Sequence, residues 1–215
     1  RDLEIQRRET DLVVGTFGRG IYILDDYSPL RTASDSLSGK AAHLFGVKDP
    51  WLYVEGDLWD GRETGSMGAE FFTAPNPPFG AEFTYYHDDE LQTRKAARRK
   101  AEIAAQQPVK DTPSPRRDTL RAEDREEAPS LLLIVKDADG NTVRQVAGDT
   151  EKGLHRTAWD LRLPPTEPIS LEVPENRPYW ESEPRGPLAV PGDYSVTLAK
   201  REGGKLIELA GPKSF

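Results

Sequence analysis

The sequence contains no cysteine in its 215 residues. This absence excludes disulfide bonds, thiolate nucleophiles and cysteine-ligated zinc sites. No apolar run approaches the roughly 20 residues that a membrane-spanning helix needs, so we expect no membrane span. Positive charge is in deficit, with 29 Lys and Arg against 37 Asp and Glu and a net charge of −8. That balance argues against a general nucleic-acid-binding protein, which is normally basic.

The usual signals at the amino terminus are also missing. The chain begins Arg1-Asp2-Leu3, without an initiator Met and without a signal peptide. We therefore expect the sequence to continue a longer protein. The lack of cysteine suits an exported protein as well as a cytosolic one, so it leaves the compartment open.

Motifs for nucleophilic or metal-dependent catalysis are absent as well. There is no G-x-S-x-G element. His43, His87 and His155 stand far apart without zinc-site spacing, so we expect them to be structural. The alternative is a weak surface metal site formed by His87 with Asp88 and Asp89. We predict no metal ion and no cofactor.

Carboxylates are abundant, but no pair stands out. A glycosidase needs two carboxyl groups at a defined separation. The acidic residues that we considered are Asp25, Asp26, Asp57, Asp60, Glu63 and Asp160. Asp160 follows Trp159 on an expected strand, where a turn or inter-strand hydrogen bond explains it. The acidic residues of the Gly-rich loop could bind Ca²⁺ but do not match an EF-hand. We predict no catalytic residue in this chain.

Residues 15–20, Gly-Thr-Phe-Gly-Arg-Gly, invite comparison with a phosphate-binding loop. Their glycines follow the order G-x-x-G-x-G, whereas the dinucleotide fingerprint is G-x-G-x-x-G. Phosphate binding also needs a helix N-terminus, but residues 21–24 are β-branched and aromatic and favour a strand. We therefore predict a turn between strands at residues 12–14 and 21–24.

Strand-like segments dominate the rest of the chain. Eighteen Gly and eighteen Pro are spread along it, which is typical of short elements joined by turns. Beyond residue 24, we expect strands in residues 42–47, 51–56, 81–87, 130–148, 153–164 and 186–209. Two of these segments contain a turn between paired strands, at Asp139-Gly140-Asn141 and at Gly203-Gly204. Residues 32–41, rich in Ser, Ala and Thr, are expected to be a linker. The pattern predicts an antiparallel sandwich.

Residues 88–128 differ from their surroundings. Residues 88–107 lack Gly and Pro, are rich in Ala, Arg, Lys, Glu and Gln, and open with three acidic residues, which favours a helix. Residues 116–128 predict a second, acidic helix. The basic cluster expected to face it consists of Arg94, Lys95, Arg98, Arg99 and Lys100, and the acidic cluster of Glu123, Asp124, Glu126 and Glu127. A helical hairpin and a solvated, partly disordered excursion both remain open.

Residues 11–26, D-L-V-V-G-T-F-G-R-G-I-Y-I-L-D-D, resemble the closing blade of sortilin-like, BNR-repeat propeller proteins, which are often labelled glycosyl hydrolases. Further matches to this group are A-H-L-F (42–45), N-P-P-F-G-A-E-F-T-Y-Y (76–86) and H-R-T-A-W-D-L-R (155–162). The order of strands and turns from residue 130 onward is similar to immunoglobulin-like modules at the ends of exported bacterial proteins. The Asp box that defines the propeller repeats, S-x-D-x-G-x-T-W, is absent.

The resemblance implies a mostly β chain with two parts. Residues 1–31 would be the last strands of a β-propeller blade. After the linker at 32–41, residues 42–215 would form an immunoglobulin-like antiparallel β-sandwich with a helical hairpin inserted at about 88–128. Arg19 would point into the propeller channel or pair with Asp25 or Asp26.

Aromatic residues give the best hypothesis for a binding site. Exposed Trp and Tyr rings can stack on sugar rings. The candidates are Trp51, Tyr53, Trp59, Tyr179 and Trp180, with Arg19 added from the resemblance. The alternative is that these aromatic rings pack inside the fold or against a long loop.

The expected function is that of a non-catalytic accessory module of an exported propeller protein. It would cap the propeller and mediate protein or glycan contacts, with the rest of its own propeller as its main partner and with no nucleic acid. Two alternatives stay open. One is a glycoside-processing enzyme whose active site lies mainly on other blades. The other is a partner-binding or sorting surface on the charged helices of residues 88–128.

Overall fold

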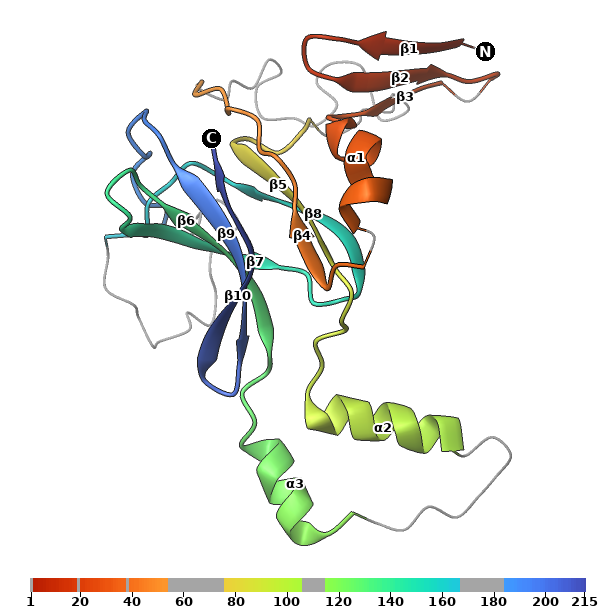
Figure 1. Cartoon of the computed structure of the whole chain (residues 1–215), viewed down its shortest axis with the longest axis vertical. Helices are drawn as coiled ribbons and strands as arrows, with labels where there is room; N and C mark the ends of the chain where they lie inside the picture. The colour runs from red at the N-terminus through yellow and green to blue at the C-terminus, as the bar shows by residue number, and fades with distance from the viewer. Residues whose placement is uncertain (1, 19, 38, 54–75, 106–114, 167–183) are drawn as a thin grey trace, which may run out of the picture.

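The computed structural model describes residues 2–18, 20–37, 39–53, 76–105, 115–166 and 184–215. Within them the chain forms ten strands and three helices, and every strand pairing is antiparallel. The prediction of a mostly β chain is confirmed. Figure 1 shows a small sheet at one end, a body of two sheets in the middle and two helices at the other end.

The amino-terminal sheet is a meander of three consecutive strands. These are β1 (Asp2–Gln6), β2 (Asp11–Gly15) and β3 (Ile21–Leu24), in the order β1-β2-β3. The sequence analysis expected β2 and β3 but not β1. The loop from β2 to β3 is closed by hydrogen bonds that Thr16 N (3.1 Å) and Thr16 Oγ1 (2.8 Å) donate to Gly20 O. A strand and not a helix follows the glycines, so the loop has no helix N-terminus for a phosphate.

Helix α1 (Ser28–Leu37) corrects one expectation. Residues 32–41 were predicted to be a linker, but they are helical through Leu37. Two features of the sequence explain the helix. Pro29 lies in the first turn, where its missing N–H is tolerated, and the Asp26 carboxylate accepts a hydrogen bond from Ser28 N at 3.2 Å.

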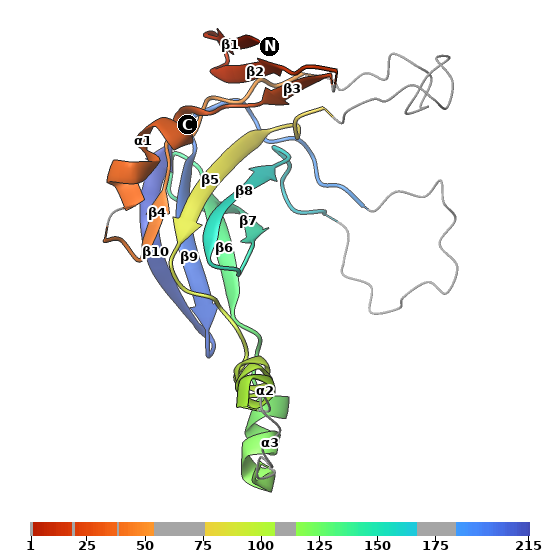
Figure 2. The same cartoon turned by 90° about the vertical axis from the view of Figure 1, so that its right-hand side faces the viewer.

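Two sheets form the body. The smaller sheet has the order β4-β5-β8 and the larger one β10-β9-β6-β7. Their strands are β4 (Ala42–Leu44), β5 (Ala81–His87), β6 (Ser130–Lys136), β7 (Thr142–Gly148), β8 (Gly153–Trp159), β9 (Ser195–Glu202) and β10 (Lys205–Ser214). Figure 2 shows the two sheets as adjacent layers. All the segments expected as strands beyond residue 80 contain one.

Alternating residues of both sheets fill a single core between them. From the smaller sheet come Leu44, Ala81, Phe83, Tyr85 and Trp159, and from the larger one Leu131, Leu133, Val135, Val196 and Leu198. All are at most 1% exposed. Period-2 alternation places Phe83 with Tyr85, and Val196 with Leu198, on one face of each strand, as the sequence predicts.

Residues 51–56 are the one expected strand that the described residues do not support. Residues 51–53 are not in a strand, and residues 54–56 lie outside the described part of the chain. The segment 42–47 is shorter than expected, because β4 ends at Leu44.

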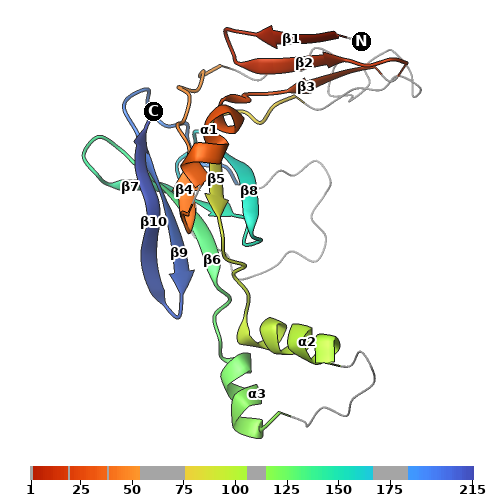
Figure 3. The ribbon, with the colours of Figure 1, turned by 45° about the vertical axis from the view of Figure 1, so that its right-hand side comes forward.

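The predicted helical pair is present, but the helices are shorter than expected: residues 88–93 are not helical, so the three acidic residues 88–90 precede the first helix and do not open it. Helices α2 (Arg94–Ala105) and α3 (Arg117–Asp124) project from the body at the end opposite the amino-terminal sheet (Figure 3). Arg98 donates two hydrogen bonds to the buried Glu123 carboxylate, at 2.7 and 2.8 Å. These bonds lower the pKa of Glu123. Lys95 also pairs with Asp124 at 3.5 Å and Arg94 with Glu126 at 3.6 Å, so the expected charge pairing is confirmed at these contacts.

Candidate functional site

Arg156 and Lys48 join the amino-terminal sheet to the body. Arg156, in the middle of β8, donates from Nη1 to Asp25 O and from Nη2 to Asp26 O, each at 2.7 Å. Its Nε pairs with the Glu82 carboxylate of β5 at 2.8 Å. A rigid guanidinium with several donors suits such a multiple contact. Arg156 therefore connects the end of β3 to the outer face of the smaller sheet.

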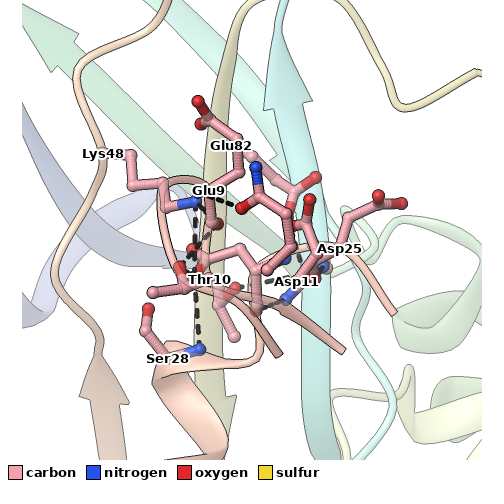
Figure 4. Close-up of polar contacts among 11 residues, drawn as sticks. Glu9, Thr10, Asp11, Asp25, Ser28, Lys48 and Glu82 are labelled. Atoms are coloured by element: carbon pink, nitrogen blue, oxygen red, sulfur yellow. Dashed lines mark hydrogen bonds and ion pairs between the residues drawn. The ribbon is translucent and has the colours of Figure 1, made fainter. Parts of the chain in front are cut away.

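Asp26 makes most of the polar contacts of this junction, and Figure 4 shows its partners Thr10, Asp11, Ser28 and Lys48 gathered together. Its carboxylate accepts hydrogen bonds from Thr10 Oγ1 at 2.9 Å and from Ser28 N at 3.2 Å, and Lys48 Nζ lies 3.8 Å away. Its own N–H donates to the Asp11 carboxylate at 3.0 Å. Lys48 also donates to Glu9 O. The junction thus ties residues 9–11, 25–28 and 48 into one network.

Two residues of this junction have positive φ angles. Thr10 has a φ of 59° and Asp26 a φ of 40°, both in the left-handed region. Such a value is an outlier for a β-branched residue. The hydrogen bond from Tyr27 N to Thr10 O, at 2.9 Å, and the contacts of the Asp26 carboxylate hold both residues in place. Strained positions of this kind persist where the surroundings fix them, and they cluster at functional sites.

The pKa values of two carboxyl groups in the junction, Glu82 and Asp26, are shifted in opposite directions. Burial raises the pKa of Glu82, and this outweighs the attraction of Arg156, which lowers it. Burial also acts to raise the pKa of Asp26. There, however, the hydrogen bonds from Ser28 and Thr10 together with Lys48 dominate and leave the pKa below its usual value.

A cleft of about 240 Å³ opens beside this junction. Its acidic lining consists of Glu9, Asp11, Asp25, Asp26, Asp49 and Glu82, with Lys48 as the basic residue of the lining. Trp51 and Tyr53 line it too, and their side chains are 76% and 54% exposed. We call this the acidic cleft. It combines hydrogen-bond acceptors with exposed aromatic rings, which is the chemistry of a polar-ligand site.

Two of the five aromatic residues that the sequence offered as binding candidates lie in the same cleft. Trp51 and Tyr53 lie together in the acidic cleft, and Tyr53 packs edge-on against Phe79 with ring centroids 5.0 Å apart. Exposed Trp51 does not support the alternative that this ring packs in the core. The predicted residues that lie outside the described part of the chain are Arg19, Trp59, Tyr179 and Trp180, as well as Asp57, Asp60 and Glu63.

The sequence analysis missed the residues that build the junction. Arg156 lies within the H-R-T-A-W-D-L-R segment, but nothing in the spacing marks it, because its main acceptors are backbone carbonyls 130 and 131 residues away. Lys48 is equally inconspicuous. The acidic pair Asp25-Asp26, after an expected strand, was the one available signal.

Two histidines meet although they are distant in sequence. The His87 and His155 rings stack with centroids 5.3 Å apart, beside buried Tyr85. The His87 ring nitrogens contact Asp89 O at 2.6 Å and Asp149 O at 3.2 Å. His43 packs edge-on against Phe45. These contacts fit the structural roles expected for all three residues.

Metal ligation finds no support among the described residues. No group of three or more His, Asp or Glu side chains there is arranged to hold a metal ion. Asp160 accepts a hydrogen bond from Arg162 N at 3.2 Å, which is the turn contact that the sequence suggested. None of the helices described is long and apolar enough to cross a membrane.

Comparison of the chain with protein families, with curated proteins and with solved structures gave no match. The function is therefore argued from the residues and their geometry.

Proposed function

We propose that this chain is a non-catalytic accessory module of an exported β-propeller protein. In this proposal the sheet β1-β2-β3 belongs to the last blade. The two-sheet body is an immunoglobulin-like domain that caps the propeller, and the acidic cleft between them contacts a glycan or a protein. Export rests on the resemblance alone.

The proposal rests mainly on one face of the amino-terminal sheet, which is apolar and exposed. Directly paired residues share a face, so Leu3, Val14 and Tyr22 lie together, as do Ile5, Leu12 and Leu24. All six are apolar, yet four are exposed: Leu3 at 58%, Ile5 at 40%, Tyr22 at 58% and Leu24 at 41%. We call this set the apolar blade face. A sheet face of this kind is stable in water only when another layer covers it.

A neighbouring blade is the partner that fits best. A propeller blade is a four-stranded antiparallel sheet that packs face to face on the next blade. The amino-terminal sheet has three strands in meander order and leaves the backbone of β3 at an edge. The face is apolar across all three strands, as blade-to-blade packing requires, and no charged residue interrupts it.

Strand order supports the immunoglobulin-like assignment of the body. Seven consecutive strands divide into sheets of three and four, with the first, second and fifth in one and the third, fourth, sixth and seventh in the other. Such a division between two antiparallel sheets that enclose one core is typical of immunoglobulin-like sandwiches. Trp159 on β8 is 1% exposed and donates to Arg162 O at 2.9 Å.

The acidic cleft supports the contact role. Trp51 and Tyr53 offer ring faces to a sugar, and the surrounding carboxylates accept hydrogen bonds from sugar hydroxyls. A glycan array probed with the chain tests this part. We expect binding that is lost in Trp51→Ala and kept in Trp51→Phe. Binding that survives Trp51→Ala would contradict a role for this rim.

The coding sequence upstream of Arg1 tests whether β1–β3 are the last strands of a propeller. We expect it to encode repeated units of four short strands. A start codon directly upstream, or an upstream region without such repeats, would contradict the proposal.

The enzyme alternative keeps one observation in its favour. Glu82 has a raised pKa and Asp26 a lowered one, and both line the acidic cleft. Carboxylates that differ in this way serve as acid and base in glycosidases. However, Asp26 is already engaged by Thr10, Ser28 and Lys48. Assays with aryl glycosides decide the point: we expect no turnover, and turnover lost in Glu82→Gln would favour the enzyme.

A further inference from the structure

A second cavity lies next to the acidic cleft and shares Asp49 and Pro50 with it. Its volume is about 260 Å³. Trp159, Tyr194 and Phe215 contribute aromatic rings to its lining, and Leu161 and Val190 contribute aliphatic side chains. We call it the aromatic pocket. It belongs to the body, at the ends of β8 and β10, and not to the amino-terminal sheet.

The aromatic wall of this pocket is held in place by several contacts. Tyr194 and Phe215 exchange two backbone hydrogen bonds, each 3.0 Å long. Tyr194 Oη donates to Val190 O at 2.6 Å. The Trp159 and Tyr194 rings pack edge to face with centroids 5.4 Å apart, and Tyr194 stacks with Phe215 at 6.2 Å. The wall is therefore preformed, which lowers the entropic cost of binding.

The lining contains a strained residue. Leu161 has a φ of 53°, which is rare for a residue with a bulky side chain. Its carbonyl accepts a hydrogen bond from Ala189 N at 2.7 Å, and this holds the turn against residues 188–190. Residues with strained backbone cluster at ligand sites.

The mouth of the pocket is apolar and exposed. Leu52 is 46% exposed and Val190 is 76% exposed, although both line the cavity. Exposed apolar residues around a cavity mark a ligand site more often than scattered ones do. Asp49 and Asp193 are the acidic residues of the lining, and no Lys, Arg or His is among the described residues that line it. The pocket thus joins an aromatic wall to negative charge.

We propose that the aromatic pocket binds a small organic cation that carries an apolar group, of the arylalkyl-ammonium class. The ring would pack on Tyr194 and Phe215, and the ammonium would lie toward Asp49 and Asp193. A cavity of about 150 Å³ holds benzene, so the volume here suits one ring with a short charged arm. Attraction of the cation to the aromatic faces adds to the pairing with the carboxylates. This site does not depend on the propeller role.

Three probes of similar size and different charge test this site: benzylamine, benzyl alcohol and benzoate. Each is titrated into the whole chain while two-dimensional NMR spectra are recorded. We expect shifts centred on Tyr194, Phe215 and Leu161. We expect the Kd for benzylamine to be about two- to fivefold lower than for benzyl alcohol, with benzoate weakest. Equal affinity for all three, absence of saturable benzylamine binding, or shifts centred elsewhere would overturn the proposal.

Matched variants separate charge from shape. Asp193→Asn is expected to remove most of the advantage of benzylamine over benzyl alcohol and to leave benzyl alcohol unchanged. Asp139→Asn removes an exposed carboxylate from the β6–β7 turn and is expected to change nothing. Val190→Ser is expected to weaken all three probes. If Asp139→Asn acts like Asp193→Asn, the effect is general electrostatics and the proposed site is wrong.

Discussion

Gly80 is a position where a single added methyl group is expected to be incompatible with the fold. Its φ is +111°, and a Cβ there would lie 1.9 Å from Trp159 O. The neighbour is backbone, so it cannot move aside easily. We expect Gly80→Ala to lower the free energy of unfolding by more than about 2 kcal/mol in urea titrations.

Gly46 provides the matched control for that substitution. A Cβ at Gly46 would meet nothing within 4 Å, and no left-handed φ is found there. We expect Gly46→Ala to be neutral or slightly stabilising. Equal destabilisation by the two substitutions would show that the close approach of Gly80 to β8 is not what the fold depends on.

Arg156 is expected to stabilise the junction between the amino-terminal sheet and the body, and not the core of the body. Arg156→Gln removes the donors to Asp25 O and Asp26 O and the ion pair with Glu82. Hydrogen bonds from charged groups are worth roughly 1.5–3 kcal/mol each at most. We therefore expect amides of β2, β3 and α1 to exchange hydrogen faster, whereas amides of β6 and β9 stay protected. Arg121→Gln, on the exposed surface of α3, is the control. Unchanged exchange in β2 and β3 would contradict this role for Arg156.

Asp26 gives the junction a defined dependence on pH. The pKa of Asp26 is lowered in the fold, so its carboxylate stabilises the fold above the usual value of 3.8, and this contribution is lost as the pH falls through the lowered pKa. Asp26→Asn lacks that contribution at every pH. We expect the difference in stability between the chain and this variant to shrink from about pH 5 to about pH 3. A difference that stays constant over this range would rule out the ionised Asp26 carboxylate as the cause.

At the scale of elements, the α2–α3 pair depends on the contact between Arg98 and Glu123. The Glu123 carboxylate is buried, so removing Arg98 leaves it without its two closest donors. We expect Arg98→Met to increase hydrogen exchange in both helices far more than Arg99→Met, which changes an exposed residue of the same helix. The double variant Arg98→Met/Glu123→Met is expected to be less unstable than the sum of its single variants, because no buried charge is left unpaired. Equal effects of Arg98→Met and Arg99→Met would contradict this account.

Elements with strong local patterns could be predicted from the sequence, and elements defined by context could not. β5 alternates buried and half-buried residues except at Thr84, which is buried as well. The β6–β7 turn carries its own signal in Asp-Gly-Asn. Helix α1 was missed because its Ser, Thr and Asp residues are weak helix formers. Its start depends on Asp26, which the junction fixes. Strand β1 was missed although Leu3 and Ile5 alternate with polar residues. The segment has only five residues and two apolar side chains, which is too short a pattern to predict a strand by itself.

At the scale of the whole molecule, the candidate site was less predictable than the fold. Trp51 and Tyr53 could be named as candidates from the sequence because Trp and Tyr rings can stack on sugars, but only the structure shows that both are exposed. The acidic cleft could not be predicted, because residues 9–11, 25–26, 48–49 and 82 meet only after three sheets are in place. Its organising contacts run from Arg156 to backbone carbonyls, which no sequence pattern reports.

Hydrogen-exchange mass spectrometry can show whether the apolar blade face packs against a neighbouring blade. The chain is measured alone and as part of the longer protein that we expect its gene to encode. The account predicts rapid exchange of β1–β3 amides in the chain alone and at least about tenfold slower exchange in the longer protein, with β6 and β9 equally protected in both. Equal exchange of β1–β3 in the two forms would contradict the docking of this sheet against a neighbouring blade.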